Sequence, residues 1–174
     1  MVSEPNSSQT AAFPVLGQPP TAADSVTNTP RVVSALTQTE SEAGANPSLG
    51  REVVANSAGS AVLVPAEGAV CLVSMRGSED TASFCQGDSA AAASGIGSDE
   101  VINNGEHFSV IGVLPATASA SDLRAVTEAG VEMPVELNAD DGYAFQTTTK
   151  PVALHFTGVN GSRHSQALFW PTQP

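Results

Sequence analysis

Three histidines are the side chains in this sequence best suited to acid–base catalysis or metal binding: His107, His155 and His164. A zinc site needs three or four ligands, and usually two of them lie close together in the chain. No two of these histidines lie within eight residues of each other, and neither cysteine is near one. The spacing therefore predicts no metal site and no cofactor, and it favours ordinary strand or surface positions for all three histidines.

Carboxylates offer a second route to a metal site. Asp99-Glu100 is an acidic pair, and the segment Asn138-Ala-Asp-Asp-Gly142 resembles the start of a calcium-binding loop. That segment lacks the alternating carboxylates and the terminal glutamate that such a loop requires. Asn, Asp and Gly are also the residues that a tight turn prefers. We therefore expect a turn here and no metal.

The sequence contains no recognisable nucleophile motif. It has no Gly-x-Ser-x-Gly element followed by a helix and no glycine-rich phosphate loop. No catalytic residue is identified, and we expect that the protein is not an enzyme. The alternative is a hydrolase-like enzyme with a site built from the loops 76–105 and 138–142. That alternative would need His107, a carboxylate and a serine in one concave pocket.

Phe169 and Trp170 are the aromatic residues with the clearest potential for binding a partner. They are adjacent on an expected strand, so their side chains must point to opposite faces. One of them should lie in the core and the other can be exposed. We consider Phe169 and Trp170 a possible interaction surface, with core packing or cover of a sheet edge as the alternative.

The charge of the chain excludes two classes of partner. Six Lys and Arg against eighteen Asp and Glu give a net charge of -12, and no basic patch is present. The summed field repels phosphate backbones, so we expect no nucleic-acid or anionic-membrane binding. No run of eighteen apolar residues occurs, so we expect no membrane span. A scattered acidic surface best explains the distribution of the carboxylates.

The two cysteines give information about the cellular compartment of the protein. Cys71 lies in an apolar run, whereas Cys85 lies in a polar stretch where a free thiol would be exposed to oxidation. We favour a disulfide between them, which indicates an oxidising compartment, and two unrelated thiols in the cytosol are the alternative. Residues 1–8 have neither a basic nor an apolar signal region, so they form no signal peptide. Either the start is misassigned, which we favour, or the protein is cytoplasmic.

The fold prediction centres on Ser60–Met75, where two apolar, β-branched runs flank a Pro-Ala-Glu-Gly turn. Further strands recur about every ten residues, separated by Gly, Asn, Asp or Pro. This pattern predicts a mainly β fold, a small antiparallel β-sandwich or open barrel with one or two short helices. We divide the chain into a disordered tail (1–12), a flexible N-terminal arm with a short helix (13–46) and a β domain (47–172). Within that domain, 76–105 is expected to be the least regular part.

Several short motifs occur in an order that resembles an uncharacterised group of actinobacterial proteins, exported or membrane-tethered, with no assigned activity. The motifs are Phe13-Pro-Val-Leu16, Pro20-Thr-Ala-Ala-Asp24, Asn46-Pro-Ser-Leu49, Val62-Leu-Val-Pro65, Val70-Cys-Leu-Val-Ser74 with Cys85, Gly112-Val-Leu-Pro115, the Leu123–Val135 hairpin and Asn138-Ala-Asp-Asp-Gly-Tyr143. The resemblance spans roughly residues 13–160. It implies an extracytoplasmic setting and supports the paired cysteines, and it carries over no catalytic residues.

Together these patterns predict a secreted or cell-surface β domain with a non-enzymatic function. Its function would be binding, sensing or acting as an accessory domain, and its partner would be an unknown protein or a cell-envelope ligand. A hydrolase-like enzyme is the first alternative, and a cytosolic interaction protein is the second. The absence of a convergent polar constellation in the sequence is the observation on which this prediction depends.

Overall fold

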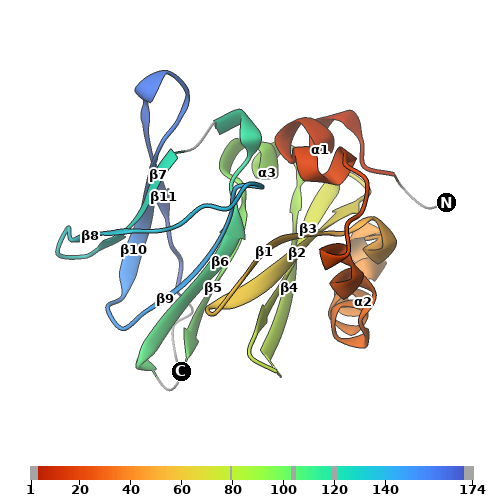
Figure 1. The fold of residues 1–174 in the computed structure, drawn as a ribbon, viewed down its shortest axis with the longest axis horizontal. Helices are drawn as coiled ribbons and strands as arrows, with labels where there is room; N and C mark the ends of the chain where they lie inside the picture. Colours follow the sequence, from red (N-terminus) through yellow and green to blue (C-terminus); the bar gives the residue numbers. More distant parts are fainter. Residues whose placement is uncertain (1–3, 79, 103–104, 119–120, 171–174) are drawn as a thin grey trace.

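The structure is a computed structural model that describes residues 4–78, 80–102, 105–118 and 121–170. It consists mainly of antiparallel strands arranged in open sheets, which confirms the predicted fold class (Figure 1). The strands form an N-terminal sheet, a central sheet and a C-terminal sheet.

The N-terminal sheet has the strand order β1-β2-β3-β4. Its strands are β1 (Arg51–Asn56), β2 (Gly59–Ala66), β3 (Ala69–Arg76) and β4 (Asp80–Gly87). The predicted hairpin is confirmed: β2 and β3 pair from Ser60 opposite Met75 to Ala66 opposite Ala69. Gly68 adopts a positive φ of 71° in the turn, a conformation that glycine reaches at little cost.

The central sheet has the order β5-β6-β9, and the C-terminal sheet has the order β11-β10-β7-β8. The central strands are β5 (Ile96–Ile102), β6 (His107–Val113) and β9 (Gly142–Thr147). The C-terminal strands are β7 (Ser121–Thr127), β8 (Glu132–Pro134), β10 (Pro151–Thr157) and β11 (Arg163–Ala167). Pro134 lies on an edge strand, where its inability to donate a hydrogen bond to a neighbouring strand matters least.

Short helices connect and cover these sheets. The α-helices are α1 (Ser7–Ala12), α2 (Pro30–Ala43) and α3 (Asp88–Ser94). The 3₁₀ segments are η1 (Pro14–Gly17), η2 (Ala23–Asn28), η3 (Pro47–Leu49), η5 (Ala116–Ala118) and η6 (Val159–Gly161). Among the described residues no helix combines the length and the apolar character needed to cross a membrane.

The prediction of an irregular 76–105 segment is wrong for most of its residues. The segment contains β4, α3 and β5, and only α3 was expected. β4 was missed because its sequence, Asp-Thr-Ala-Ser-Phe-Cys-Gln-Gly, lacks alternating large apolar residues. Its side chains are mostly half-buried, and the strand forms because it pairs along the whole length of β3.

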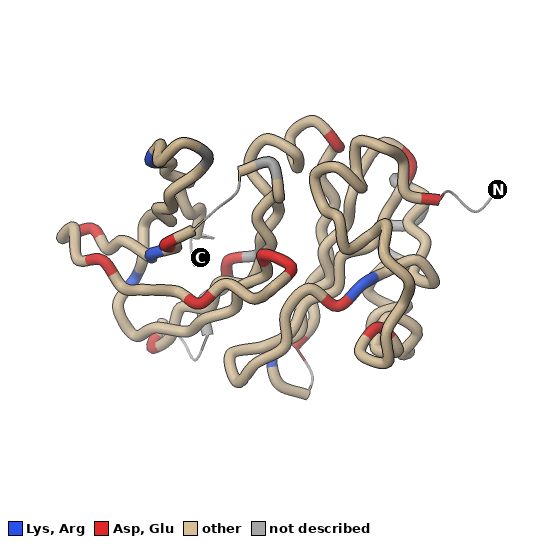
Figure 2. The backbone as a smooth tube through the Cα atoms, turned by 45° about the horizontal axis from the view of Figure 1, so that its top comes forward, with Lys and Arg blue, Asp and Glu red and all other residues tan. Residues whose placement is uncertain are grey.

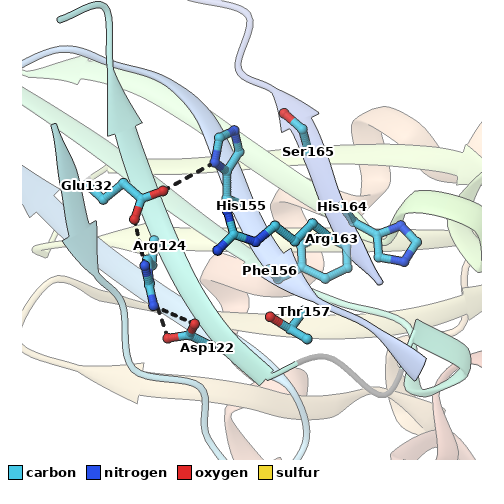
Figure 3. A pocket seen from close by; sticks show the side chains of 9 residues that line it. All are labelled: Asp122, Arg124, Glu132, His155, Phe156, Thr157, Arg163, His164 and Ser165. Carbon is cyan, nitrogen blue, oxygen red and sulfur yellow. Dashed lines mark hydrogen bonds and ion pairs between the residues drawn. The ribbon is translucent and has the colours of Figure 1, made fainter. Parts of the chain in front are cut away.

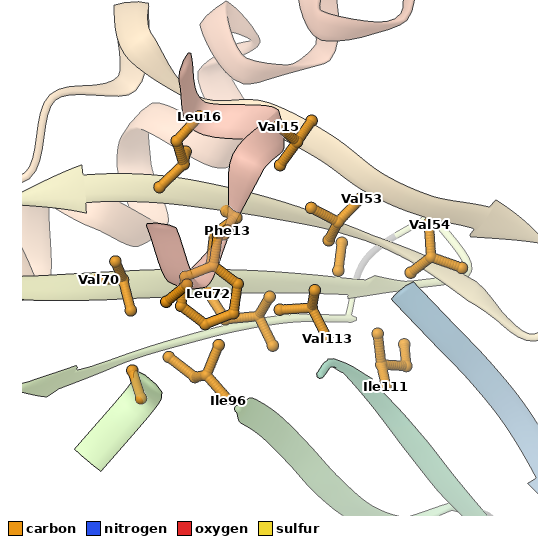
Figure 4. Packing of buried hydrophobic residues seen from close by; sticks show 14 of the residues in the cluster. Phe13, Val15, Leu16, Val53, Val54, Val70, Leu72, Ile96, Ile111 and Val113 are labelled. Carbon is orange, nitrogen blue, oxygen red and sulfur yellow. The ribbon is translucent and has the colours of Figure 1, made fainter. Parts of the chain in front are cut away.

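The central sheet is buried on both faces. On one face, Ile96, Ile111 and Val113 pack against the N-terminal sheet through residues such as Leu63 and Leu72 (Figure 4). On the other face, the core is shared with the C-terminal sheet. The residues of this second core are Val110, Leu114, Leu123, Ala125, Tyr143, Leu154, Phe156 and Leu168. The order of layers is therefore N-terminal sheet, central sheet, C-terminal sheet.

The N-terminal arm, expected to be flexible, is packed onto the sheets. Phe13 is 2% exposed and lies within the core between the N-terminal and central sheets (Figure 4). Val32 and Leu36 of α2 are buried against the opposite face of the N-terminal sheet. The helix has 14 residues, and its apolar stripe is buried against the sheet.

The described part of residues 1–12 also differs from the predicted disordered tail. Ser7–Ala12 forms α1, which begins with a capping box between Asn6 and Gln9. The buried Gln9 amide donates hydrogen bonds to the carbonyl oxygens of Ala66 and Ala69, at 2.9 and 2.7 Å. It also donates to Asp88 Oδ1 at 2.9 Å. One side chain therefore ties the start of the chain to the β2–β3 turn and to α3.

The predicted disulfide between Cys71 and Cys85 is confirmed. The two cysteines are direct register partners on β3 and β4, with Cα atoms 4.0 Å apart. Cys71 is fully buried beneath α2, in the same cluster as Val32 and Leu36. The bridge thus joins an edge strand to the interior of its own sheet.

Replacing both cysteines with alanine should lower the free energy of unfolding by ~3 kcal/mol, because the bridge restricts the unfolded chain. Urea denaturation followed by circular dichroism measures the change. In the reduced wild-type protein, amide hydrogen exchange should accelerate in β4 before it accelerates in β2, because β4 is the edge strand. Equal acceleration in β2 and β4 would contradict this assignment.

Substituting Gln9→Met should destabilise the protein by about 1–3 kcal/mol, because the buried Ala66 and Ala69 carbonyl groups lose their side-chain donor. Thermal and urea denaturation report the change. Ser8→Ala, on the exposed face of the same helix, is the matched control and should stay within about 0.5 kcal/mol of wild type. Similar stabilities for the two variants would show that α1 does not contribute through Gln9.

Candidate functional site

A pocket of about 170 Å³ lies on the C-terminal sheet (Figure 3). We call it the charged pocket, because most of its side chains are charged or can become so. Its lining residues are Asp122, Arg124, Glu132, His155, Phe156, Thr157, Arg163, His164 and Ser165.

The strand register explains why these side chains meet. β10 lies between β7 and β11, and His155 is opposite both Arg124 and Ser165. Thr157, two residues further, is opposite Arg163. Register partners share a face of the sheet, and so do alternate residues along one strand. These polar groups therefore occupy the outer face, while Leu154 of β10 is buried in the core.

A β-bulge in β7 lies at the edge of the charged pocket. The pairing of β7 with β10 shifts between His155 and Thr157, so β7 contains one extra residue there. Asp122 lies within this bulge and has a positive φ of 55°, which is uncommon outside glycine. Its carboxylate turns back to Arg124, with an Oδ2–Nη2 distance of 2.5 Å.

Arg124 is fully engaged in an ion-pair chain. Its second terminal nitrogen lies 2.6 Å from Glu132 Oε2, and Glu132 Oε1 lies 3.6 Å from His155 Nδ1. The pKa of Glu132 is lowered, mainly because Arg124 donates a hydrogen bond to its carboxylate. Exposed pairs of this kind add little stability, so the main consequence is a fixed orientation for Arg124, Glu132 and His155.

Arg163 differs from Arg124 in having no acidic partner. Its side chain extends from β11 across the outer face toward His155 (Figure 3). Among the described residues it has no hydrogen bond and no ion pair. The charged pocket therefore contains one guanidinium whose donors are all available to a ligand. Acidic residues are otherwise spread over all the sheets (Figure 2).

The three histidines that the sequence analysis considered lie in three different environments. His107 begins β6 in the central sheet and does not line the charged pocket. His164 lies on the inner side of β11, stacked on Phe156 with ring centroids 5.1 Å apart. Among the described residues only His155 of the three has a carboxylate beside it, and there no hydrogen bond joins it to Ser165. Among the described residues no three His, Cys, Asp or Glu side chains are grouped to hold a metal ion.

Phe169 and Trp170 do point in opposite directions. Trp170 packs edge-on against Phe108, with ring centroids 5.3 Å apart, and its indole nitrogen donates to the Pro151 carbonyl oxygen at 2.6 Å. Phe169 is 82% exposed. The division into one packed and one exposed ring is therefore as expected, and a binding role for either ring stays a prediction.

A second cavity, of about 330 Å³, lies beneath Phe169. Asp99 of β5 reaches into it and accepts a hydrogen bond from the Phe169 backbone N–H at 3.2 Å. Burial raises the pKa of the Asp99 carboxyl to about 6, against the lowering effects of that hydrogen bond and of Arg76. Burial likewise raises the pKa of Tyr143. The sequence drew attention to Asp99 only as part of an acidic pair, and it did not place Asp99 in a cavity, because β5 was not expected.

Comparison with protein-family models, curated proteins and solved structures finds no significant match to this chain. The resemblance to an actinobacterial exported group therefore stays a prediction.

Substituting Asp99→Asn should stabilise the protein selectively at neutral pH. The folded pKa of about 6 lies above the ordinary value, so the native state holds the proton more tightly and wild-type stability falls as pH rises from about 4 to 6. Asparagine has no charge to bury, so this loss disappears. Urea denaturation at pH 4 and pH 7 tests the direction of the effect. The variant should have a higher free energy of unfolding than the wild type only at pH 7. A constant difference at both pH values would contradict the assignment.

Proposed function

We propose that this protein is a non-enzymatic extracytoplasmic binding domain that holds an anionic ligand group in the charged pocket. The observation that carries the proposal is the unpaired Arg163 beside an Arg124 that already has two carboxylate partners. A guanidinium is planar and can donate two parallel hydrogen bonds to a carboxylate or a phosphate. Arg163 supplies those donors, and Arg124 does not.

The size and charge of the pocket narrow the class of ligand. A volume of about 170 Å³ suits one ionic group of a ligand rather than a whole large molecule. Asp122 and Glu132 border the pocket, and the chain has a net charge of -12. Extended polyanions are therefore repelled, whereas a single carboxylate or phosphate can lie on Arg163. The ring of His155 offers a second donor on the same face.

The disulfide supports an extracytoplasmic compartment for the proposed function. A bridge between Cys71 and Cys85 is typical of secreted and cell-surface proteins, since cytosolic thiols are kept reduced. This supports a secreted or surface-exposed location, with a cell-envelope ligand or protein as the partner. It also agrees with the actinobacterial exported group that the sequence resembles. Two free thiols by mass spectrometry of the native protein would favour a cytosolic interaction protein instead.

Substituting Arg163→Gln should weaken anion binding at least about ten-fold, because a hydrogen bond to a charged group is lost. The probes are succinate and inorganic phosphate, titrated separately and followed by amide chemical shifts in β10 and β11. Whichever probe saturates identifies the carboxylate or the phosphate as the ligand group. Lys150→Gln removes the same charge outside the pocket and is the matched control, with unchanged affinity expected.

Two outcomes would contradict the proposed function. Equal affinities for Arg163→Gln and Lys150→Gln would show that the probes respond only to overall charge. Hydrolysis of 4-nitrophenyl acetate that disappears in Ser165→Ala would assign the pocket to a hydrolase, with His155 between Ser165 and Glu132.

A further inference from the structure

Three sheet edges meet at the second cavity, which we call the edge cleft. β4, β5 and β11 are each the outermost strand of their own sheet, and all three contribute to its lining. Its volume of about 330 Å³ is enough for a small organic ligand. The cleft shares no lining residue with the charged pocket, so it is a separate site.

The floor of the edge cleft is open because two glycines lie beneath Tyr143. A Cβ atom on Gly97 would lie 3.1 Å from the Tyr143 hydroxyl, and one on Gly112 would lie 2.4 Å from it. A larger residue at position 112 would displace the ring, and one at position 97 would crowd it. The Tyr143 ring is 1% exposed, so this part of the cleft lining is a packed side chain.

The edge cleft contains donor groups on Gln86, Ser94 and Tyr143, and it also contains two acceptor groups that are not fully satisfied. Gln166 Oε1 is buried and has no hydrogen-bond partner among the described residues. Asp99 also lines the cleft, and the Phe169 backbone N–H is the one donor recorded to its carboxylate. A buried acceptor without a donor costs free energy, which a ligand with N–H groups would recover. The cleft therefore favours a ligand that donates hydrogen bonds.

The rim of the edge cleft is aromatic. Phe84 is 41% exposed and Phe169 is 82% exposed, and they line the cleft from β4 and from the segment after β11. Large exposed apolar side chains beside a cavity indicate a binding surface. Two phenyl rings can cover the apolar body of a ligand, and their faces attract a cation.

The charges around the edge cleft select a cation. No Lys, Arg or His lines it among the described residues. The basic group that acts on Asp99 is Arg76, which is 4% exposed and already bonded to Ser109 and Ser74. The net charge of -12 also raises the local concentration of cations.

We propose that the edge cleft binds a small primary amine with an apolar body, with Asp99 as its counter-ion and Gln166 as a second acceptor. The ammonium group would lie against the carboxylate and the amide oxygen. The apolar body would lie between Phe84 and Phe169. The amine site shares no residue with the charged pocket. A negative result at one site therefore says nothing about the other.

A titration with phenethylamine at pH 7.5 tests the proposal, with amide chemical shifts in β5 and in residues 166–169 as the readout. The neutral 2-phenylethanol and the anionic 3-phenylpropionate carry the same phenyl group and serve as comparison probes. Phenethylamine should bind at least about ten-fold more tightly than 2-phenylethanol, since its N–H donors pair with a charged acceptor. Equal affinities would overturn the proposal.

Variants locate the binding site. Asp99→Asn should weaken phenethylamine binding at least about ten-fold, while Glu67→Gln removes one exposed carboxylate from the β2–β3 turn and should leave it unchanged. Phe169→Ala should weaken phenethylamine and 2-phenylethanol alike. Equal effects of Asp99→Asn and Glu67→Gln would show that only overall charge matters.

A pH titration of the wild-type protein gives an answer that does not depend on the folding of any variant. The groups that act on Asp99 are Arg76 from β3, Tyr143 from β9 and the Phe169 N–H from the C-terminal segment. An alkyl ammonium stays protonated from pH 7.5 to 5. Phenethylamine affinity should fall over this range as Asp99 gains its proton. A pH-independent affinity would exclude Asp99 as the counter-ion.

Discussion

The structure depends on the burial of the central sheet on both of its faces. In β6, Val110 faces the C-terminal sheet, while Ile111 and Val113 face the N-terminal sheet. A strand with apolar residues at consecutive positions cannot leave either face to water, so it must lie between two other layers. This requirement stacks the three sheets, and it brings the edge strands β4, β5 and β11 together on one side.

Sequence reasoning succeeded where side chains alone decide the structure. The Ser60–Met75 hairpin was predictable because two β-branched runs flank a turn, and the β7–β8 hairpin was predictable for the same reason. It failed for β4 and β5, where few large apolar residues alternate. Those strands form because a neighbour offers unpaired backbone groups, and β4 is further held by Cys85. Pairing between strands depends on the tertiary structure, so the local pattern of residues does not reveal it.

Neither candidate site could be derived in the same way. The residues of the charged pocket come from different strands, and their meeting depends on the register of β7, β10 and β11 and on the bulge at Asp122. A shift of one residue would turn His155 into the core. The edge cleft combines Phe84, Asp99 and Phe169 from three different sheets or their ends, and only the stacking of the layers relates them. The sequence did indicate one exposed and one packed aromatic residue, but the expected strand there was wrong, because Phe169 and Trp170 follow the end of β11.

The contacts of Gln9 have a consequence for the order of events during synthesis. Its partners Ala66 and Asp88 follow it by 57 and 79 residues. Translation adds about 5–20 residues each second, so α1 leaves the ribosome seconds before its docking surface exists. Until then its apolar neighbours, including Phe13, have nothing to pack against. The docking of α1 therefore has to wait for the β2–β3 turn and α3, so it is a late step in the assembly of the N-terminal sheet.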